Sequence, residues 1–132
     1  MKQEHLDKLV DNLLEVEPEK INWVGYLIGK DEDGKDVSDG DMYDIEFGPF
    51  AVEIKDRSYE TAQGNLGRDI GLKVIKGHLT VVELMQEADG PRYQEFAAMM
   101  KLSDGLKAKM EKYQSETSQE AILYSSLLEL IE

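Results

Sequence analysis

Residues 42–55, MYDIEFGPFAVEIK, decide the fold class of this chain. Apolar residues occupy every second position from Tyr43 to Phe47, and the same alternation resumes from Phe50 to Ile54. A period of two is typical of a strand with one buried face. The Gly48-Pro49 pair that separates the two runs is typical of a turn. The stretch therefore predicts two neighbouring strands, at 42–47 and 50–55.

Upstream of this stretch, the sequence predicts a helix and a further strand. Residues 3–16 place their apolar side chains on one helical face, and Pro18 ends the pattern. Residues 21–28, INWVGYLI, are rich in β-branched and aromatic types, which favours a buried strand. Three successive strands without a crossover helix indicate an antiparallel meander. Residues 56–78 contain four glycines, and they predict a short helix or loop near 59–66 followed by an extended piece at 70–76.

The C-terminal half has the pattern of helices. Thr80 and Glu83 form a capping-box pattern at the start of an apolar segment, which predicts a helix that ends at Asp89-Gly90-Pro91. A heptad-like seam, with Ser103 as its one polar step, predicts a long helix over 92–113. Thr117 and Glu120 form a second capping box before a final helix, and the short link at 114–117 predicts that the last two helices pack as an antiparallel hairpin.

Together these elements predict one α+β domain over residues 1–132. It has an N-terminal helix, a small antiparallel sheet of three or four strands, and a helical C-terminal half that ends in a helical hairpin.

The charge of the chain opposes direct binding to nucleic acid or to anionic membranes. The net charge is −13, from 28 acidic and 15 basic residues. Phosphate polymers and anionic lipids attract basic surfaces and repel acidic ones. Residues 63–72, QGNLGRDIGL, have the outline of a helix-turn-helix core, but Gly77 stands where that motif needs a branched apolar residue. The partner that the composition predicts is a basic protein.

No sequence motif indicates catalysis, a cofactor or a metal. The chain has no cysteine, which excludes thiolate chemistry and disulfides. Its two histidines, His5 and His78, fit an exposed first turn and a turn position, and no nucleophile elbow or phosphate-binding loop is present. With no apolar segment that resembles a signal or a membrane span, the sequence predicts a cytoplasmic protein without enzymatic activity.

The segment 30–46 is the most acidic part of the chain, with eight acids and two lysines. It suits a solvated loop between strands, an irregular calcium site, or a surface for a basic partner, and it does not match the spacing of a helix–loop–helix calcium site. The predicted partner-binding residues are its eight acids: Asp31, Glu32, Asp33, Asp36, Asp39, Asp41, Asp44 and Glu46.

Two functions from different classes fit these features. The first is a small acidic module, of the kind used by phage-type inhibitors, that covers a basic nucleic-acid-binding surface of another protein. The second is a structural protein that forms homo-oligomers through the C-terminal helices. The predicted self-association residues lie on the seam: Phe96, Met99, Leu106, Met110 and Tyr113. A pocket for a small ligand between sheet and helices is a third, weaker alternative.

Overall fold

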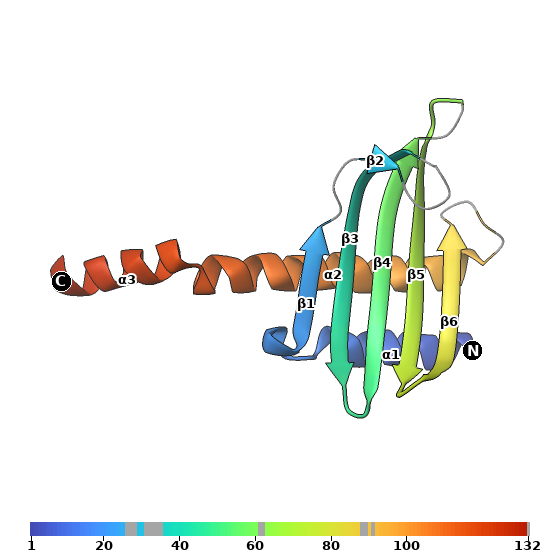
Figure 1. Ribbon diagram of the computed structural model, residues 1–132, viewed down its shortest axis with the longest axis horizontal. Helices are drawn as coiled ribbons and strands as arrows, with labels where there is room; N and C mark the ends of the chain where they lie inside the picture. The colour runs from blue at the N-terminus through green and yellow to red at the C-terminus, as the bar shows by residue number, and fades with distance from the viewer. Residues whose placement is uncertain (26–28, 31–35, 61–62, 88–89, 91, 132) are drawn as a thin grey trace.

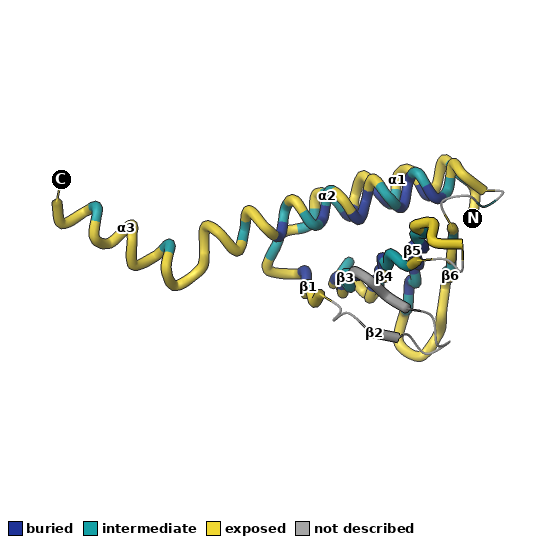
Figure 2. The backbone as a smooth tube through the Cα atoms, turned by 90° about the horizontal axis from the view of Figure 1, so that it is seen from above, coloured by how far each residue is buried: buried dark blue, intermediate teal, exposed yellow. Residues whose placement is uncertain are grey.

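The computed structural model is an open antiparallel sheet with two helices packed against one face (Figures 1 and 2). It describes residues 1–25, 29–30, 36–60, 63–87, 90 and 92–131. Five strands lie across the sheet in chain order, so the sheet is a meander. These strands are β1 (Ile21–Gly25), β3 (Asp36–Phe47), β4 (Phe50–Glu60), β5 (Leu66–Lys76) and β6 (Leu79–Glu87), and a short β2 (Gly29–Lys30) pairs with the start of β3.

Tight turns with glycine in the left-handed region join the central strands. Gly48 has a φ of 60° between β3 and β4, and Gly77 has a φ of 61° between β5 and β6. A positive φ at the first central residue is typical of the two-residue turns that suit the twist of a hairpin. The predicted strands at 42–47 and 50–55 are confirmed, although both are longer than the alternation indicated.

Two helices cover one face of the sheet. They are α1 (Gln3–Leu14) and the first part of α2 (Tyr93–Thr117), and a short 3-10 turn η1 (Pro18–Lys20) links α1 to β1. The N-terminal helix is confirmed, and it ends before Pro18 as expected. Figure 2 shows α1 and α2 as one layer and the sheet as the other, and no helix of the described residues lies on the far face of the sheet, which we call the uncovered face.

The helices α1 and α2 run side by side in the same direction. Near their starts, the Gln3 side chain donates a hydrogen bond to the Gln94 carbonyl over 3.4 Å. Near the end of α1, the Lys109 ammonium donates to the carbonyls of Leu14 and Val16, the latter over 2.8 Å. Because the last carbonyls of a helix have no partner within it, a cation at this position stabilises the end of α1.

The core lies between this helix layer and the sheet. Every second side chain from Val52 to Asp56 in β4 and from Ile70 to Val74 in β5 faces the helices and is buried, as the period of a strand predicts. The buried apolar residues are Leu6, Val10, Leu13, Ile21, Tyr43, Ile45, Val52, Ile54, Ile70, Leu72, Val74, Phe96, Ala98, Met99, Leu102, Leu106 and Met110.

The helix predicted from Thr80 is wrong, because residues 79–87 form strand β6. The strand pairs with β5 along its length, with Leu84 opposite Leu72 and Val82 opposite Val74. The Thr-x-x-Glu spacing is a local signal for a helix, but three consecutive β-branched residues, Thr80 to Val82, follow a tight turn and favour a strand. His78 lies in that turn, and it does not precede a helix.

The expectation for residues 56–78 is partly confirmed. The extended piece at 70–76 is the second half of β5. The short helix or loop near 59–66 is not a helix, since β4 continues to Glu60, β5 begins at Leu66, and Gly64 has a φ of 81° in the turn between them. With β5 and β6 added, the sheet has five strands instead of the three or four predicted.

The C-terminal helices are present, but they do not fold back on each other as a hairpin. The last helix, α3 (Gln119–Ile131), continues away from the sheet beyond the end of α2 (Figures 1 and 2). The backbone breaks at Ser118, which has an extended ψ of 151°, and the Ser118 hydroxyl caps α3 by accepting a hydrogen bond from the Ala121 amide. Thr117, the predicted cap, instead donates its hydroxyl to the Tyr113 carbonyl within α2.

Candidate functional site

A group of charged side chains lies where α2 crosses the strands, and Asp56 is the most buried charged residue among them. Val52, Ile54 and Asp56 share the face of β4 that meets the helices, so the strand period carries the carboxylate into the interface. Asp56 is only 7% exposed. It accepts hydrogen bonds from Arg68 Nε at 3.0 Å, from Arg68 Nη2 at 2.6 Å, and from the Ser103 hydroxyl at 2.5 Å.

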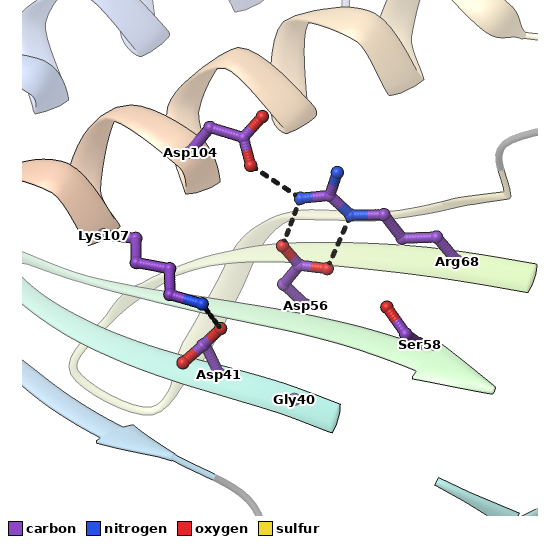
Figure 3. Close-up of a pocket in the computed structure, with 7 residues that line it drawn as sticks. All are labelled: Gly40, Asp41, Asp56, Ser58, Arg68, Asp104 and Lys107. Carbon is purple, nitrogen blue, oxygen red and sulfur yellow. Dashed lines mark hydrogen bonds and ion pairs between the residues drawn. The ribbon is translucent and has the colours of Figure 1, made fainter. Parts of the chain in front are cut away.

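Asp41 of β3, Arg68 of β5 and three residues of α2 complete this group, and all but Ser103 are drawn in Figure 3. We call the group the Asp56 cluster: Asp41, Asp56, Arg68, Ser103, Asp104 and Lys107. Asp104 accepts a second hydrogen bond from Arg68 Nη2 at 2.9 Å. Asp41, directly opposite Asp56 on the next strand, accepts a hydrogen bond from the Trp23 indole at 2.9 Å and pairs with Lys107 at 3.6 Å.

The Asp56 cluster borders a hollow of about 210 Å³, with Gly40 and Ser58 on its strand side (Figure 3). Each carboxylate of the cluster contacts a cation of the same cluster, and because Asp56 and Asp104 share Arg68, the cluster keeps one unbalanced negative charge. The hydrogen bond to Asp56 raises the pKa of Arg68 above its ordinary value, which keeps the guanidinium charged. The arrangement fastens α2 to β3, β4 and β5, and this is the role that its contacts support.

Tyr43 lies beside the cluster in an unusual environment. Its ring is fully buried and stacks on Trp23, with a centroid separation of 6.4 Å. The Tyr43 hydroxyl lies near the Ser103 hydroxyl and the cluster carboxylates, but its geometry to the described residues does not meet that of a full hydrogen bond. Burial raises the pKa of the Tyr43 hydroxyl, and the negative charge of Asp41 acts in the same direction.

A second buried carboxylate lies on the uncovered face of the sheet. Asp69 is 2% exposed and accepts hydrogen bonds from Arg57 Nη2 at 3.2 Å and from the Tyr59 hydroxyl at 3.1 Å. The Tyr59 ring covers Gly67, where an added Cβ would lie 2.4 Å from the ring. A glycine is needed there because the ring occupies the space of a side chain. The contacts of Asp69 with Arg57 and Tyr59 join β5 to β4.

The acids of the segment 30–46 do not form one described surface. Asp31, Glu32 and Asp33 lie outside the described residues, and Asp36 and Asp39 are placed on β3 by their backbone alone. Asp41 faces the helices and belongs to the Asp56 cluster, whereas Asp44 and Glu46 are exposed on the opposite face of β3. The suggestion of an irregular calcium site falls mainly on residues outside the described part of the chain.

The residues of the predicted self-association seam lie in the core. Phe96, Met99, Leu106 and Met110 are at most 5% exposed, and Tyr113 packs at the edge of the same cluster. They contact the sheet and α1 of their own chain, since α2 supplies most of its apolar face to this layer. A second copy cannot reach these four side chains while the chain is folded.

Helix α3 exposes its apolar residues, and none of its described residues is buried. Its large apolar side chains are exposed to solvent, and the last buried residue that precedes α3 in the chain is Met110 of α2. The exposed large side chains are Ile122, Leu123, Tyr124, Leu127, Leu130 and Ile131, with exposed fractions between 53% and 85%. Exposed apolar patches of this size mark interaction surfaces in most proteins.

No family model, curated protein or solved structure matches this chain. Among the described residues, no three His, Asp or Glu side chains are arranged to hold a metal ion. In the same part of the chain, no helix is both long and apolar enough to cross a membrane.

Sequence analysis missed the Asp56 cluster, although two signals of it were present. Extending the alternation of β4 by one step places Asp56 on the same face as Val52 and Ile54. Ser103 is the one polar residue of an otherwise apolar seam on α2. A single polar residue on an apolar face does not by itself reveal its partner. The structure shows that the Ser103 hydroxyl donates a hydrogen bond to Asp56, so each of these two buried polar groups has a partner.

Proposed function

We propose that this chain acts by binding another protein, and that α3 is the segment that binds. The observation that carries the proposal is an apolar helix beyond the folded layers that has no buried residue among those described and whose six large exposed apolar side chains are 53% to 85% exposed. Each leucine of α3 that a partner covers would contribute on the order of 2 kcal/mol to the free energy of binding, because its apolar surface is removed from water. The helix thus has a strong driving force to bury its surface on a partner.

The net charge supports a basic partner. The excess of acidic over basic residues gives −13 for the chain, whereas the uncovered face of the sheet mixes acids such as Asp44 and Glu53 with Lys55 and Lys73. A chain with this net charge attracts cationic proteins over distances of about a Debye length, which speeds their association. If the basic surface of the partner binds nucleic acid, this chain would compete with that nucleic acid by occupying the same surface.

Affinity capture from the native host tests the proposal at two ionic strengths. The bait is the full chain, compared with a Leu123→Ser/Leu127→Ser variant and with a Ser125→Ala/Ser126→Ala control on the polar side of α3. We expect a protein that is retained by the wild type and by the control, but not by the leucine variant. Equal retention by all three baits would refute a binding role for α3.

Assembly of identical copies is the competing function. Because the seam of α2 is buried within its own chain, α3 is the exposed apolar helix that a second copy could contact. Light scattering of the purified chain distinguishes the two, because a stable dimer at about 10 μM would favour assembly.

A further inference from the structure

We infer that the free edge of β6 binds an extended segment of another protein, which adds a strand to the sheet and carries basic side chains. This surface is separate from α3, so the inference goes beyond the binding role proposed for that helix. It rests on the open backbone edge of β6, on the composition of this strand, and on the two acids that the strand exposes.

Strand β6 ends the sheet, because β5 is its one neighbouring strand among the described residues (Figure 1). A strand directs about half of its backbone N–H and C=O groups to each side, so β6 presents a row of these groups on its outer side. None of the nine residues of β6 is buried, whereas β5 has a continuous buried run from Asp69 to Leu72. The outer side of β6 is therefore open to a further strand.

The composition of β6 leaves this edge with little protection against pairing. Edge strands are commonly short, or they carry lysine or proline. β6 has nine residues, LTVVELMQE, with neither lysine nor proline, whereas the opposite edge strand β1 has five. A register shift between Val74 and Ile75 of β5 interrupts the pairing near the start of β6. The usable edge is therefore the continuous run from Val82 to Glu87.

The side chains of this run define what an added strand must carry. Leu84 lies opposite the buried Leu72, so it faces the helices. The period of two then places Glu83, Met85 and Glu87 on the uncovered face, and all three are exposed. The two acids are about 13 Å apart along the strand. Beside them the added strand would carry lysine or arginine, with apolar or β-branched residues between the two cations.

The charges favour a basic segment over a second copy of this chain. Lys73 of β5 lies opposite Glu83, but the residue opposite Glu87 is Asp69, whose carboxylate already pairs with Arg57. A lysine or arginine of the added strand would give Glu87 a directly opposite cation, which β5 does not supply. Two copies of β6 would instead bring four glutamates and no lysine or arginine to one interface, between chains of net charge −13.

A model peptide tests the inference on the full chain. The peptide has eight residues, with lysine at its second and sixth positions, threonine at its first, third and eighth, and valine elsewhere. Paired antiparallel with β6, it places its lysines beside Glu87 and Glu83. With about 1 mM peptide, we expect slower amide hydrogen exchange in β6 and unchanged exchange in β1, measured by nuclear magnetic resonance. A peptide with glutamate in place of both lysines should bind at least about 10-fold more weakly at about 50 mM salt, and this difference should shrink at about 500 mM.

Backbone methylation distinguishes an added strand from general electrostatic attraction. One variant of the lysine peptide carries N-methyl groups at its second, fourth and sixth residues, and another carries them at its third, fifth and seventh. Successive N–H groups of a strand point to opposite edges, so one variant has its methyl groups toward β6 and the other has them away from it. We expect one variant to lose at least about 10-fold in affinity and the other to stay within about 3-fold of the unmodified peptide.

Charge reversal on the protein provides the matched control. Glu83→Lys/Glu87→Lys should prefer the glutamate peptide, whereas Glu111→Lys/Glu116→Lys, with the same net charge but at exposed sites of α2, should keep the wild-type preference.

Four results would overturn the inference. They are no binding of the lysine peptide at about 1 mM, equal affinities for the lysine and glutamate peptides, equal affinities of the two methylated variants, and protection of β6 amides that rises with protein concentration in the absence of peptide. The last result would show that β6 pairs with a second copy. All of these measurements concern β6, so the role proposed for α3 is tested separately by capture from lysate.

Discussion

Replacing Asp56 with alanine tests the structure at the point where the helix layer meets the sheet. Asp56→Ala removes the acceptor of three hydrogen bonds, two from Arg68 and one from Ser103. It leaves the Ser103 hydroxyl without that acceptor and Arg68 with Asp104 as its remaining carboxylate. Breaking a buried ion pair on one side costs about 3–5 kcal/mol. Because the Arg68 side chain is 27% exposed and keeps a second partner, we expect a loss of about 3 kcal/mol.

Urea unfolding followed by circular dichroism measures this loss. With a denaturant slope of about 1.5 kcal/mol/M, the midpoint should fall by about 2 M. Asp44→Ala is the matched control, since Asp44 is an exposed aspartate on the opposite face of the sheet, and it should change the free energy of unfolding by less than about 0.5 kcal/mol.

A double variant separates the loss of a charge from the loss of packing. Asp56→Leu/Arg68→Met removes both charges and keeps most of the volume, so it should be less destabilising than Asp56→Ala alone. If Asp56→Ala costs less than about 1 kcal/mol, or matches the Asp44 control, the carboxylate is not buried against α2 and the reasoning fails.

Other variants test separate parts of the structure. Because the pKa of Tyr43 is raised in the folded state, its contribution to stability is complete below pH 10 and is lost as the pH rises further, so Tyr43→Phe should flatten the fall in melting temperature above pH 10. Lys109→Met should cost about 1–2 kcal/mol in urea unfolding because it frees the last carbonyls of α1, whereas the exposed Lys101→Met should cost less than about 0.5 kcal/mol. Gly48→Ala should cost about 1–2 kcal/mol from its positive φ, and a melting temperature equal to that of the wild type would contradict the turn. Ending the chain after Ser118 should change the free energy of unfolding by less than about 0.5 kcal/mol, since α3 buries no residue, and a large loss would show that α3 packs on the sheet.

The parts of the fold that the sequence predicts are those where one period is clear. The helix at the N-terminus and the two strands around Gly48-Pro49 are examples, because a single face is apolar in each. Residues 79–87 failed because a helical cap and a run of β-branched residues compete, and only pairing with β5 decides between them.

The candidate sites were harder to predict because they depend on contacts across the chain. The seam from Phe96 to Met110 has the pattern of an interface between copies, but a helix packed on its own core has the same pattern. The apolar face of α3 was visible in the sequence, whereas its separation from α2 was not, since the break at Ser118 is a property of backbone geometry. The Asp56 cluster joins residues from three strands and one helix, which a local pattern does not reveal.

The parallel pairing of α1 with α2 has a consequence for synthesis on the ribosome. The side-chain contacts between these helices join residues 90 to 95 positions apart. Helix α1 is synthesised before the sheet, whereas α2, which packs against α1 in the folded chain, is synthesised after the sheet. Until then, the apolar side chains of both α1 and the nascent meander lack their cover, and contacts so distant along the chain slow folding. The nascent chain should therefore depend on chaperones until residue 110 has left the exit tunnel, a delay that ribosome-bound fragments of increasing length would reveal by protease sensitivity.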